Sequence, residues 1–485
     1  MSTLSAAVVA DRATTNADRP TGSTPLLPVV GSSLSVPLVT GDAVRYVNLD
    51  YAATAPALVS VAERVAQNLT YYSSVHRGAG WPSVVSTTLY EQSRETVAEF
   101  VGARPNDVVV FTRNTTDSLN LLASVVPQGC HVIHLDAEHH GNLLSWERCD
   151  HTVVAVRRDL KATLAALEAA LAAASLRGAR EPVPAMVAVT GASNVTGEAL
   201  ALAEIVALAK AHGARVAVDG AQLVPHRRVD MTALDIDYLA FSGHKLYAPY
   251  GTGALIGRRD WLDAGAPYLR GGGAVHEVDR SGTDWAEAPA RHEGGTPNLL
   301  GAIAIAAACE ALAALPEGSL QAHEHVLRSR LEAGLATLPD VRMLRIWPED
   351  DVDRVAVVGF TVQGRDPQRV ATWLSAEHGI GVRHGRFCAH QLVSVLAPLE
   401  GVAGIPSIGP TTTASANVPQ ALRASLGVGS TIFDVDRLVA ALRQLSVSGE
   451  FWNYAKKDGQ WVPSPDPRSW GPAGEYRDFV GPCRT

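Results

Sequence analysis

A lysine and a carboxylate, each placed directly after a short apolar run, are the residues of this chain best suited to chemistry. Lys245 closely follows the run 238–241, and Asp219 follows the run 216–218. A lysine at the end of a buried strand can form a Schiff base with an aldehyde, and a carboxylate can hold the proton of a pyridine ring. The pair predicts a site for pyridoxal phosphate. For each residue alone, the alternative is a surface lysine or a turn carboxylate.

Hydroxyl groups near these runs predict a phosphate site. Ser242 and His244 lie in the same segment as the lysine, while Thr115 and Thr116 follow the apolar run 108–111 and begin a predicted helix. Hydroxyls and the N–H groups of a helix N-terminus suit a phosphate dianion. The alternative is an ordinary capped helix start. The chain lacks the glycine-rich pattern of a nucleotide P-loop, so that kind of site is not expected.

Two more polar side chains are placed to contact a cofactor ring. His139 follows the run 131–135, where an imidazole can stack on an aromatic cofactor; the alternative is a loop histidine bonded to backbone. His139 and His140 are adjacent and face different ways on any regular element, so a metal pair is not expected. Gln222 lies one turn beyond the aspartate and is placed to donate to the ring's phenolic oxygen.

A cysteine and an arginine in the last third of the chain are candidates for substrate chemistry. Cys388 lies in a polar loop with Arg386 and two histidines, where positive charge favours a nucleophilic thiolate. The alternative is a small buried cysteine. Arg423 precedes a β-like run and would hold a substrate α-carboxylate in a bidentate pair, unless it is a plain surface charge.

Alternating strand and helix patterns must position these groups. Helical spacing covers residues 162–174 and 202–212, and a buried helix is predicted over 303–315. Such alternation predicts an α/β fold with a mainly parallel sheet of about seven strands, covered by helices on both faces. Ligands bind at the carboxyl ends of the strands of such sheets, which is where the candidate residues fall. The apolar β-rich runs are 108–111, 131–135, 153–156, 186–189, 216–218, 238–241 and 254–256.

After Pro316 the pattern changes to a smaller C-terminal α/β unit, which is closed by a helix near residues 435–445. We find no internal repeat. The predicted organisation is a disordered tail over 1–40, an N-terminal segment over 41–58 that packs with the small domain, a large cofactor-binding domain over 59–315, the small domain over 316–445 with a long loop over 392–419, and an aromatic, proline-rich extension over 446–485 that packs its rings on the body.

Bulk properties exclude several classes of protein. The 485 residues carry a net charge of −8 without a block of lysine and arginine, so nucleic acid is not an expected partner. No apolar run is long enough to span a membrane, and no secretory signal is recognised. The five cysteines are widely spaced, which argues against disulfides or a metal site and suits the reducing cytoplasm.

Together these motifs resemble the class V, fold-type I pyridoxal phosphate enzymes, most closely the SufS-type cysteine desulfurases and selenocysteine lyases. The likeness covers about residues 45 to 445. The matching segments are 49–54, 75–78, 113–117, 138–142, 193–195, 218–222, 242–245, 294–298, 381–388 and 423–425.

The resemblance implies a role for each matching residue. Lys245 would carry the cofactor, Asp219 would pair with the pyridine nitrogen, and Gln222 with the ring oxygen. The catalytic residues would be Lys245, His139 and Cys388. The thiol of Cys388 would take sulfur as a persulfide. The phosphate would be bound by Thr115, Thr116, Ser242 and His244, with Thr296 reaching in from the other subunit of a homodimer that shares its active sites. The substrate site would include Arg423, Asn194, Arg383, His76 and Ala52.

The expected activity is removal of sulfur from L-cysteine to give alanine and a persulfide on Cys388, which a sulfur-acceptor protein could then receive. This chain departs from the family in having Arg386-Phe387 before the cysteine and a longer stretch before Arg423. These departures leave open another class V reaction: a C–S or C–Se lyase, an aminotransferase or an epimerase. A non-catalytic scaffold is the remaining alternative.

Overall fold

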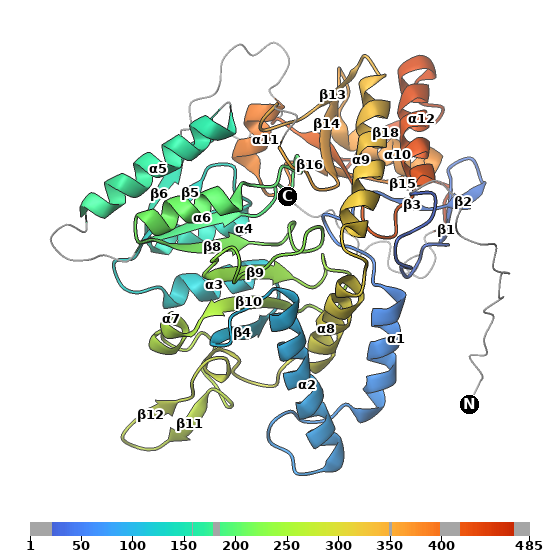
Figure 1. Ribbon diagram of the computed structural model, residues 1–485. Coiled ribbons are helices and arrows are strands. Elements are labelled where there is room, and N and C mark those ends of the chain that lie inside the picture. Colours follow the sequence, from blue (N-terminus) through green and yellow to red (C-terminus); the bar gives the residue numbers. More distant parts are fainter. Residues whose placement is uncertain (1–21, 158, 178–184, 349–351, 398–417, 470–485) are drawn as a thin grey trace.

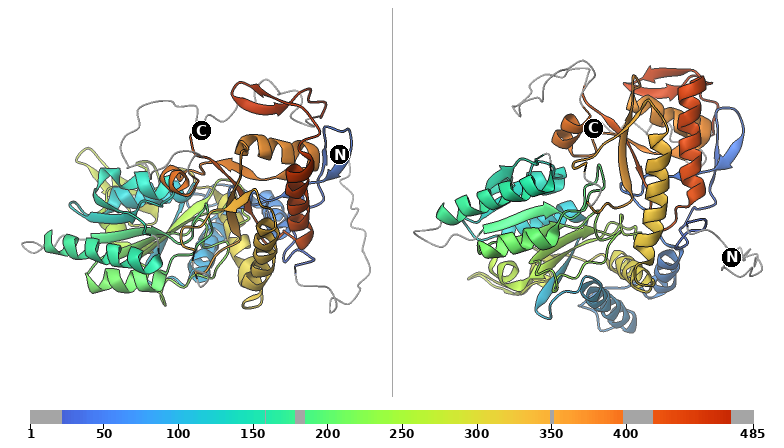
Figure 2. Two further views of the ribbon diagram at one scale, coloured as in Figure 1. Left: turned by 90° about the horizontal axis from the view of Figure 1, so that it is seen from above. Right: turned by 45° about the horizontal axis from the view of Figure 1, so that its top comes forward.

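The computed structural model describes residues 22–157, 159–177, 185–348, 352–397 and 418–469, without the side chains of 176 and 177. The chain forms a large unit around one broad sheet and a smaller unit beside it, as Figure 1 and both views of Figure 2 show. Within these residues, no helix combines the length and the apolar character needed to cross a membrane. The same residues contain no cluster of side chains suited to a metal ion.

The large unit is built on a seven-stranded mixed sheet, which confirms the predicted fold class. Only β10 runs antiparallel to its neighbours, and the other strands are parallel to one another. Each of the seven predicted runs overlaps a strand, although β6 (150–154) both begins and ends earlier than the predicted run over 153–156. In sheet order the strands are β4 (Asp107–Thr112), β10 (Gly253–Arg258), β9 (Tyr238–Ser242), β8 (Arg215–Asp219), β7 (Ala185–Thr190), β5 (His131–Leu135) and β6 (Asp150–Val154).

Helices cover both faces of this sheet because alternate strand residues point to opposite sides and both sets are apolar. One set packs with α1 (Val59–Asn68), α2 (Trp81–Phe100), α5 (Leu160–Arg177), α6 (Leu202–Ala211) and α8 (Leu299–Ala313). The other packs with α3 (Thr115–Val125), η3 (Ser145–Arg148) and α7 (Arg259–Ala264). The remaining elements of this unit are η2 (Leu69–Tyr71), α4 (His140–Leu144), β11 (Val275–Val278), β12 (Thr283–Trp285) and η4 (Ala290–His292).

The smaller unit holds an antiparallel sheet in the order β13 (Val341–Met343), β14 (Val357–Val362), β17 (Ala421–Ser425) and β16 (Arg383–Gly385). Its long helices are α9 (Ser319–Ala336), α10 (Pro367–His378) and α12 (Ile432–Ser448). The loop predicted over 392–419 differs at its start, because residues up to Leu396 belong to α11 (His390–Leu396), whose Leu392 and Val393 are buried. Residues 398–417 lie outside the described part.

The N-terminal segment packs against the smaller unit. β3 (Val47–Asn48) pairs in parallel with β15 (Ile380–Gly381), and β1 (Ser35–Pro37) forms a hairpin with β2 (Ala43–Arg45). Part of the predicted disordered tail is therefore ordered, because the N–H groups of Leu26 and Leu27 donate to the carbonyl of Val428. Residues 1–21 lie outside the described part.

The C-terminal extension forms a hairpin of β18 (Tyr454–Lys457) and β19 (Gln460–Pro463) that packs on α10. The buried carboxylate of Glu377 on α10 accepts hydrogen bonds from the N–H groups of Phe451 and Trp452 and from the hydroxyl of Tyr454, at 3.1, 3.0 and 2.9 Å. Glu377 thus helps to join the extension to the small unit. Residues 470–485, with Trp470, lie outside the described part.

Glu377→Ala is expected to lower the free energy of unfolding by about 1–3 kcal/mol, because three partly buried donors lose their acceptor. Denaturant unfolding of the full chain measures the change. Glu317→Ala, at an exposed position, is the matched control. Equal stability of the two variants would contradict this role for Glu377.

Candidate active site

The lysine and the aspartate singled out from the sequence meet at the carboxyl ends of β8 and β9. Asp219 is 3% exposed, and its Oδ1 accepts from the N–H of Ala221 at 3.0 Å. Burial raises the pKa of Asp219, and the ammonium of Lys245 acts in the opposite direction. Burial likewise lowers the pKa of Lys245, opposed by Asp219. The two groups therefore lie close enough to sense each other's charge.

Hydroxyls gather beside them at the N-terminus of α3. The Oγ of Ser242 accepts from the N–H of Thr115 at 2.8 Å and lies 2.6 Å from the hydroxyl of Thr115. Thr116 is exposed in the first turn of α3, and Asn114 caps that helix by accepting from the N–H of Asp117 at 3.0 Å. The structure thus brings three of the predicted phosphate ligands together at one helix end.

Two histidines flank this group as neutral rings. His139 caps α4, and its Nδ1 accepts from the N–H of Gly141 at 3.0 Å. Burial, followed by the charge of Lys245, lowers the pKa of His139 to about 3. The Nδ1 of His244 lies 3.0 Å from the hydroxyl of Thr54, and burial lowers its pKa to about 4. A neutral imidazole at position 139 can stack on an aromatic ring without electrostatic cost.

Gln222 joins the site to the N-terminal segment. Its Nε2 donates to the carbonyl of Ala52 at 2.7 Å, and the N–H of Ala52 donates to Ser425 Oγ at 2.9 Å. The donation to a cofactor ring that was predicted for Gln222 stays a prediction, because its amide binds backbone in this structure. The contact instead brings the predicted substrate residue Ala52 beside the strand-end groups.

The predicted carboxylate clamp is buried between the two units. Arg423 is 3% exposed; its Nη1 donates to the carbonyl of Asn194 at 2.9 Å and its Nη2 to Asp50 at 3.0 Å. Its Nε is buried and has no hydrogen-bond partner among the described residues. The exposed Arg383 lies 3.8 Å from Asp50. The guanidinium therefore keeps donor capacity for another acceptor.

Cys388 is exposed on the loop between β16 and α11, directly after Phe387, whose ring lies against the guanidinium of Arg423. Its carbonyl accepts from the N–H of His140 at 2.8 Å, while the carbonyl of Phe387 accepts from Asn194 Nδ2 at 2.7 Å. Burial lowers the pKa of Arg423, and the charge of a Cys388 thiolate acts in the opposite direction, as it does on Lys245. The thiol therefore belongs to the same site as the lysine.

Two predicted residues do not join this group within the chain. His76 is exposed and lies 2.8 Å from Glu91 of α2. Thr296 is exposed in the turn between η4 and α8. Across the described residues neither side chain hydrogen bonds to the strand-end groups. Thr296 keeps its predicted role only if a second subunit supplies it.

Sequence reasoning missed the buried carboxyl of Glu138, which directly precedes His139. Its Oε2 accepts from the N–H of Thr190 and from Asn142 Nδ2, both at 2.8 Å. Its Oε1 is buried without a hydrogen-bond partner among the described residues. Burial raises the pKa of Glu138 well above its usual range. Asp50 was also missed, because its partner Arg423 is far away in sequence.

Glu138→Gln is expected to gain stability relative to wild type as the pH rises. Folding raises the pKa of this carboxyl above its value of about 4.3 in the unfolded chain. Between those two pKa values, the free energy of unfolding of wild type falls by up to about 1.4 kcal/mol for each pH unit, because only the unfolded chain releases the proton. Glutamine has no such cost. The measurement is the unfolding midpoint of the holoenzyme at about pH 5 and about pH 8, with the exposed Glu99→Gln as control. A difference that stays constant with pH would refute the burial argument.

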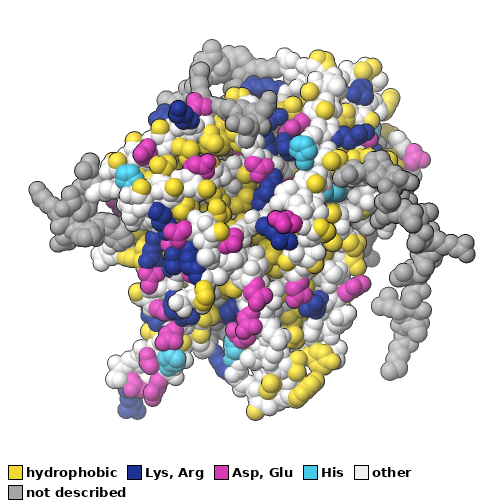
Figure 3. Space-filling model, in the orientation of Figure 1, with side chains coloured by type: hydrophobic (Ala, Val, Ile, Leu, Met, Phe, Trp, Pro, Cys, Tyr) yellow, Lys and Arg dark blue, Asp and Glu magenta, His cyan; other side chains and the backbone are white. Residues whose placement is uncertain are grey.

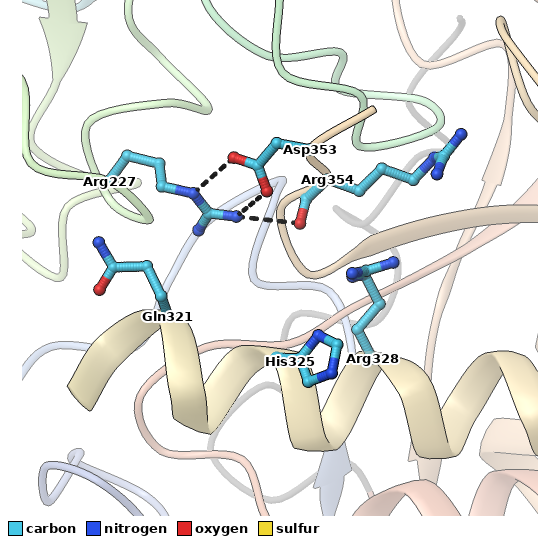
Figure 4. A pocket seen from close by; sticks show the side chains of 6 residues that line it. All are labelled: Arg227, Gln321, His325, Arg328, Asp353 and Arg354. Carbon is cyan, nitrogen blue, oxygen red and sulfur yellow. Dashed lines mark hydrogen bonds and ion pairs between the residues drawn. The ribbon is translucent and has the colours of Figure 1, made fainter. Parts of the chain in front are cut away.

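A separate pocket lies at the junction of the two units (Figure 4), with a volume of about 240 Å³. Arg227 there pairs with both carboxylate oxygens of Asp353, at 2.9 and 2.8 Å. Arg328 pairs with Glu332 at 3.2 Å. Both of these arginines are therefore paired with carboxylates, and none of the strand-end groups lines the pocket.

The donor set at the strand ends fits pyridoxal phosphate. Lys245 supplies an amine, Asp219 a buried carboxylate, and the start of α3 supplies N–H and hydroxyl groups for a dianion. The fold and this site together define an enzyme of the pyridoxal phosphate class.

Comparison with known proteins identifies the family. The model of the aminotransferase class-V family matches residues 47–438, so the chain belongs to that family. A cysteine desulfurase of Dickeya dadantii is 36% identical over 414 residues, which cover 84% of this chain and 93% of that protein. A probable cysteine desulfurase of Vibrio cholerae is 33% identical over 416 residues, covering 84% and 95%. The expected family, enzyme class and cofactor are thereby confirmed.

Solved structures agree with the fold. The apo cysteine desulfurase of Thermococcus onnurineus superimposes with a TM-score of 0.70 at 31% identity, covering 83% of this chain and 94% of that chain. The cysteine desulfurase CsdA of Escherichia coli gives 0.66 at 32% identity, covering 82% and 94%. A cystine C–S lyase at 22% identity and a TM-score of 0.62 shares the fold alone.

Proposed function

We propose that this chain is a cysteine desulfurase that converts L-cysteine to alanine and leaves the sulfur on Cys388 as a persulfide. The observation that carries the proposal is the placement of an exposed thiol on the loop that Asn194 and His140 hold beside Lys245. The relatives named cysteine desulfurase support the substrate.

The protein's own residues divide the work. Pyridoxal phosphate, when bound, supplies an electron sink for charge that develops at the substrate Cα. Lys245 would hold the cofactor and then take the Cα proton, since burial lowers the pKa of its ammonium. Asp219 would keep the ring nitrogen protonated, and the neutral His139 would stack on the ring. Thr115, Thr116, Ser242 and His244 would bind the phosphate.

Sulfur transfer uses the thiol. The Cys388 thiolate attacks the substrate sulfur, the Cβ–S bond breaks, and a proton completes alanine while the new S–S bond remains on the enzyme. Arg423 would hold the substrate carboxylate with donors that Asp50 and Asn194 leave free. Atoms balance as cysteine plus enzyme thiol giving alanine plus enzyme persulfide.

The test is a single turnover of the holoenzyme with L-cysteine. We expect alanine and a mass increase of one sulfur atom on the Cys388 peptide. Binding of another amino acid without alanine formation from cysteine would favour a C–S or C–Se lyase, an aminotransferase or an epimerase instead. The presence of Arg386 and Phe387 directly before the cysteine is the observation that supports this second candidate function.

The working enzyme is proposed to be a homodimer in the reducing cytoplasm. Exposed apolar side chains gather where α1 ends and α2 begins, at the lower end of Figure 3. An exposed apolar patch of this kind favours burial against a partner. The exposed apolar residues there are Leu69, Tyr71, Tyr72, Trp81 and Val84. In such a dimer, Thr296 would reach the active site of the second subunit.

The four described cysteines are free, which agrees with a reducing compartment. A sulfur-acceptor protein would receive the persulfide.

A further inference from the structure

One residue, Phe387, contacts both groups that would hold a substrate carboxylate, Asn194 through its backbone carbonyl and Arg423 through its ring. The amide of Asn194 donates to the carbonyl of Phe387 at 2.7 Å. The guanidinium carbon of Arg423 lies 5.1 Å from the centre of the Phe387 ring. In this arrangement the expected carboxylate site is filled by the protein's own loop.

The same loop is held in an unfavourable backbone conformation. Phe387 and Cys388 have φ angles of 52° and 53°, in the left-handed region that residues with a Cβ rarely adopt. Two hydrogen bonds hold this pair: Asn194 to the carbonyl of Phe387, and the N–H of His140 to the carbonyl of Cys388 at 2.8 Å. Loss of the first bond would let the loop relax, because strained residues persist only where their surroundings hold them.

We propose that Phe387 is a gate residue, and that a substrate α-carboxylate displaces it from Asn194 and Arg423 and thereby frees the Cys388 thiol to move. This deepens the proposed function and rests on it. The ligand class that opens the gate is an α-amino acid with a free carboxylate.

The competition favours the carboxylate. Charge-assisted hydrogen bonds between guanidinium and carboxylate are stronger than the contact of a guanidinium with an aromatic face. Arg423 has donors to offer, because Asp50 and the Asn194 carbonyl take one N–H each and Nε has no partner among the described residues. When Phe387 leaves, the side-chain amide of Asn194 is free to donate a hydrogen bond to the ligand.

The first experiment measures alkylation of Cys388 by iodoacetamide in the holoenzyme, followed by peptide mass spectrometry. L-Alanine carries the carboxylate without a sulfur to transfer, and L-alaninamide lacks that charge. L-Alanine is expected to raise the alkylation rate at least about threefold, and L-alaninamide to leave it unchanged. Equal effects of the two ligands, or a slower rate with L-alanine, would overturn the proposal.

Variants separate gating from folding. Phe387→Leu keeps the backbone carbonyl that accepts from Asn194 but removes the aromatic face over Arg423, so its alkylation rate without ligand should lie between those of wild type without and with L-alanine, and its affinity for L-alanine should rise about fivefold. Phe387→Tyr keeps the ring and should restore wild-type values. Phe433→Leu, on α12 and 57% exposed, is the matched control.

Wild-type alkylation and affinity in Phe387→Leu would refute the gate. Failure of the proposed function has a different signature: neither alanine nor persulfide would form from cysteine, whereas the alkylation measurements with L-alanine would still report on the loop.

Discussion

Lys245→Ala is expected to lower the rate of alanine formation from cysteine by at least about 10³-fold, because this one residue is proposed both to hold the cofactor and to take the Cα proton. Borohydride should fix the cofactor to the Lys245 peptide in wild type and to no peptide in the variant. The buried carboxylate of Asp219, the proposed partner of the ring nitrogen, remains in the variant. The Lys245→Ala change should therefore affect cofactor attachment and the reaction rate rather than folding.

Lys161→Ala, at an exposed position on α5, is the matched control and should keep full activity. Borohydride fixation at another lysine, or an active Lys245→Ala variant, would refute the assignment of Lys245.

Cys388→Ser is expected to abolish persulfide formation and to lower sulfur release by at least about 10³-fold, since removal of a nucleophile costs most of the rate of a covalent step. The oxygen of serine is a poor acceptor of sulfur, and the small change leaves the contacts of the Cys388 carbonyl in place. Sulfur release is measured with the holoenzyme and L-cysteine. Cys149→Ser is the control, because burial raises the pKa of Cys149 and keeps it unreactive.

The two variants should differ in a second measurement. Exchange of the Cα proton of L-alanine with deuterium from solvent needs Lys245 but no thiol, so it should persist in Cys388→Ser and stop in Lys245→Ala. Sulfur release that continues in Cys388→Ser would instead favour a lyase that frees sulfur without an enzyme persulfide.

Local sequence was sufficient for the central sheet of the large unit. Its strands are short apolar runs, and their ends carry the polar residues Thr115, His139, Asp219 and Ser242 in positions that a parallel sheet must bring to one edge. The family motifs indicated the cofactor class for the same reason, since the groups proposed to hold the cofactor lie next to individual strands.

Contacts between distant segments could not be predicted in this way. α11 was missed because a short helix in a sequence rich in loop residues is stabilised by burial of Leu392 and Val393, which no local pattern reveals. Glu138 is unremarkable in sequence and becomes a buried carboxyl only when β5 and β7 pair beside it.

By itself, then, the sequence determined the sheet, the cofactor class and the presence of a thiol and an arginine suited to cysteine. Only the tertiary structure decided that Asn194, Phe387 and Arg423 meet, and that the loop carrying Cys388 rests on the groups expected to bind substrate. The physical reason is that strand ends follow from patterns a few residues long, whereas this contact depends on how the two units pack against each other.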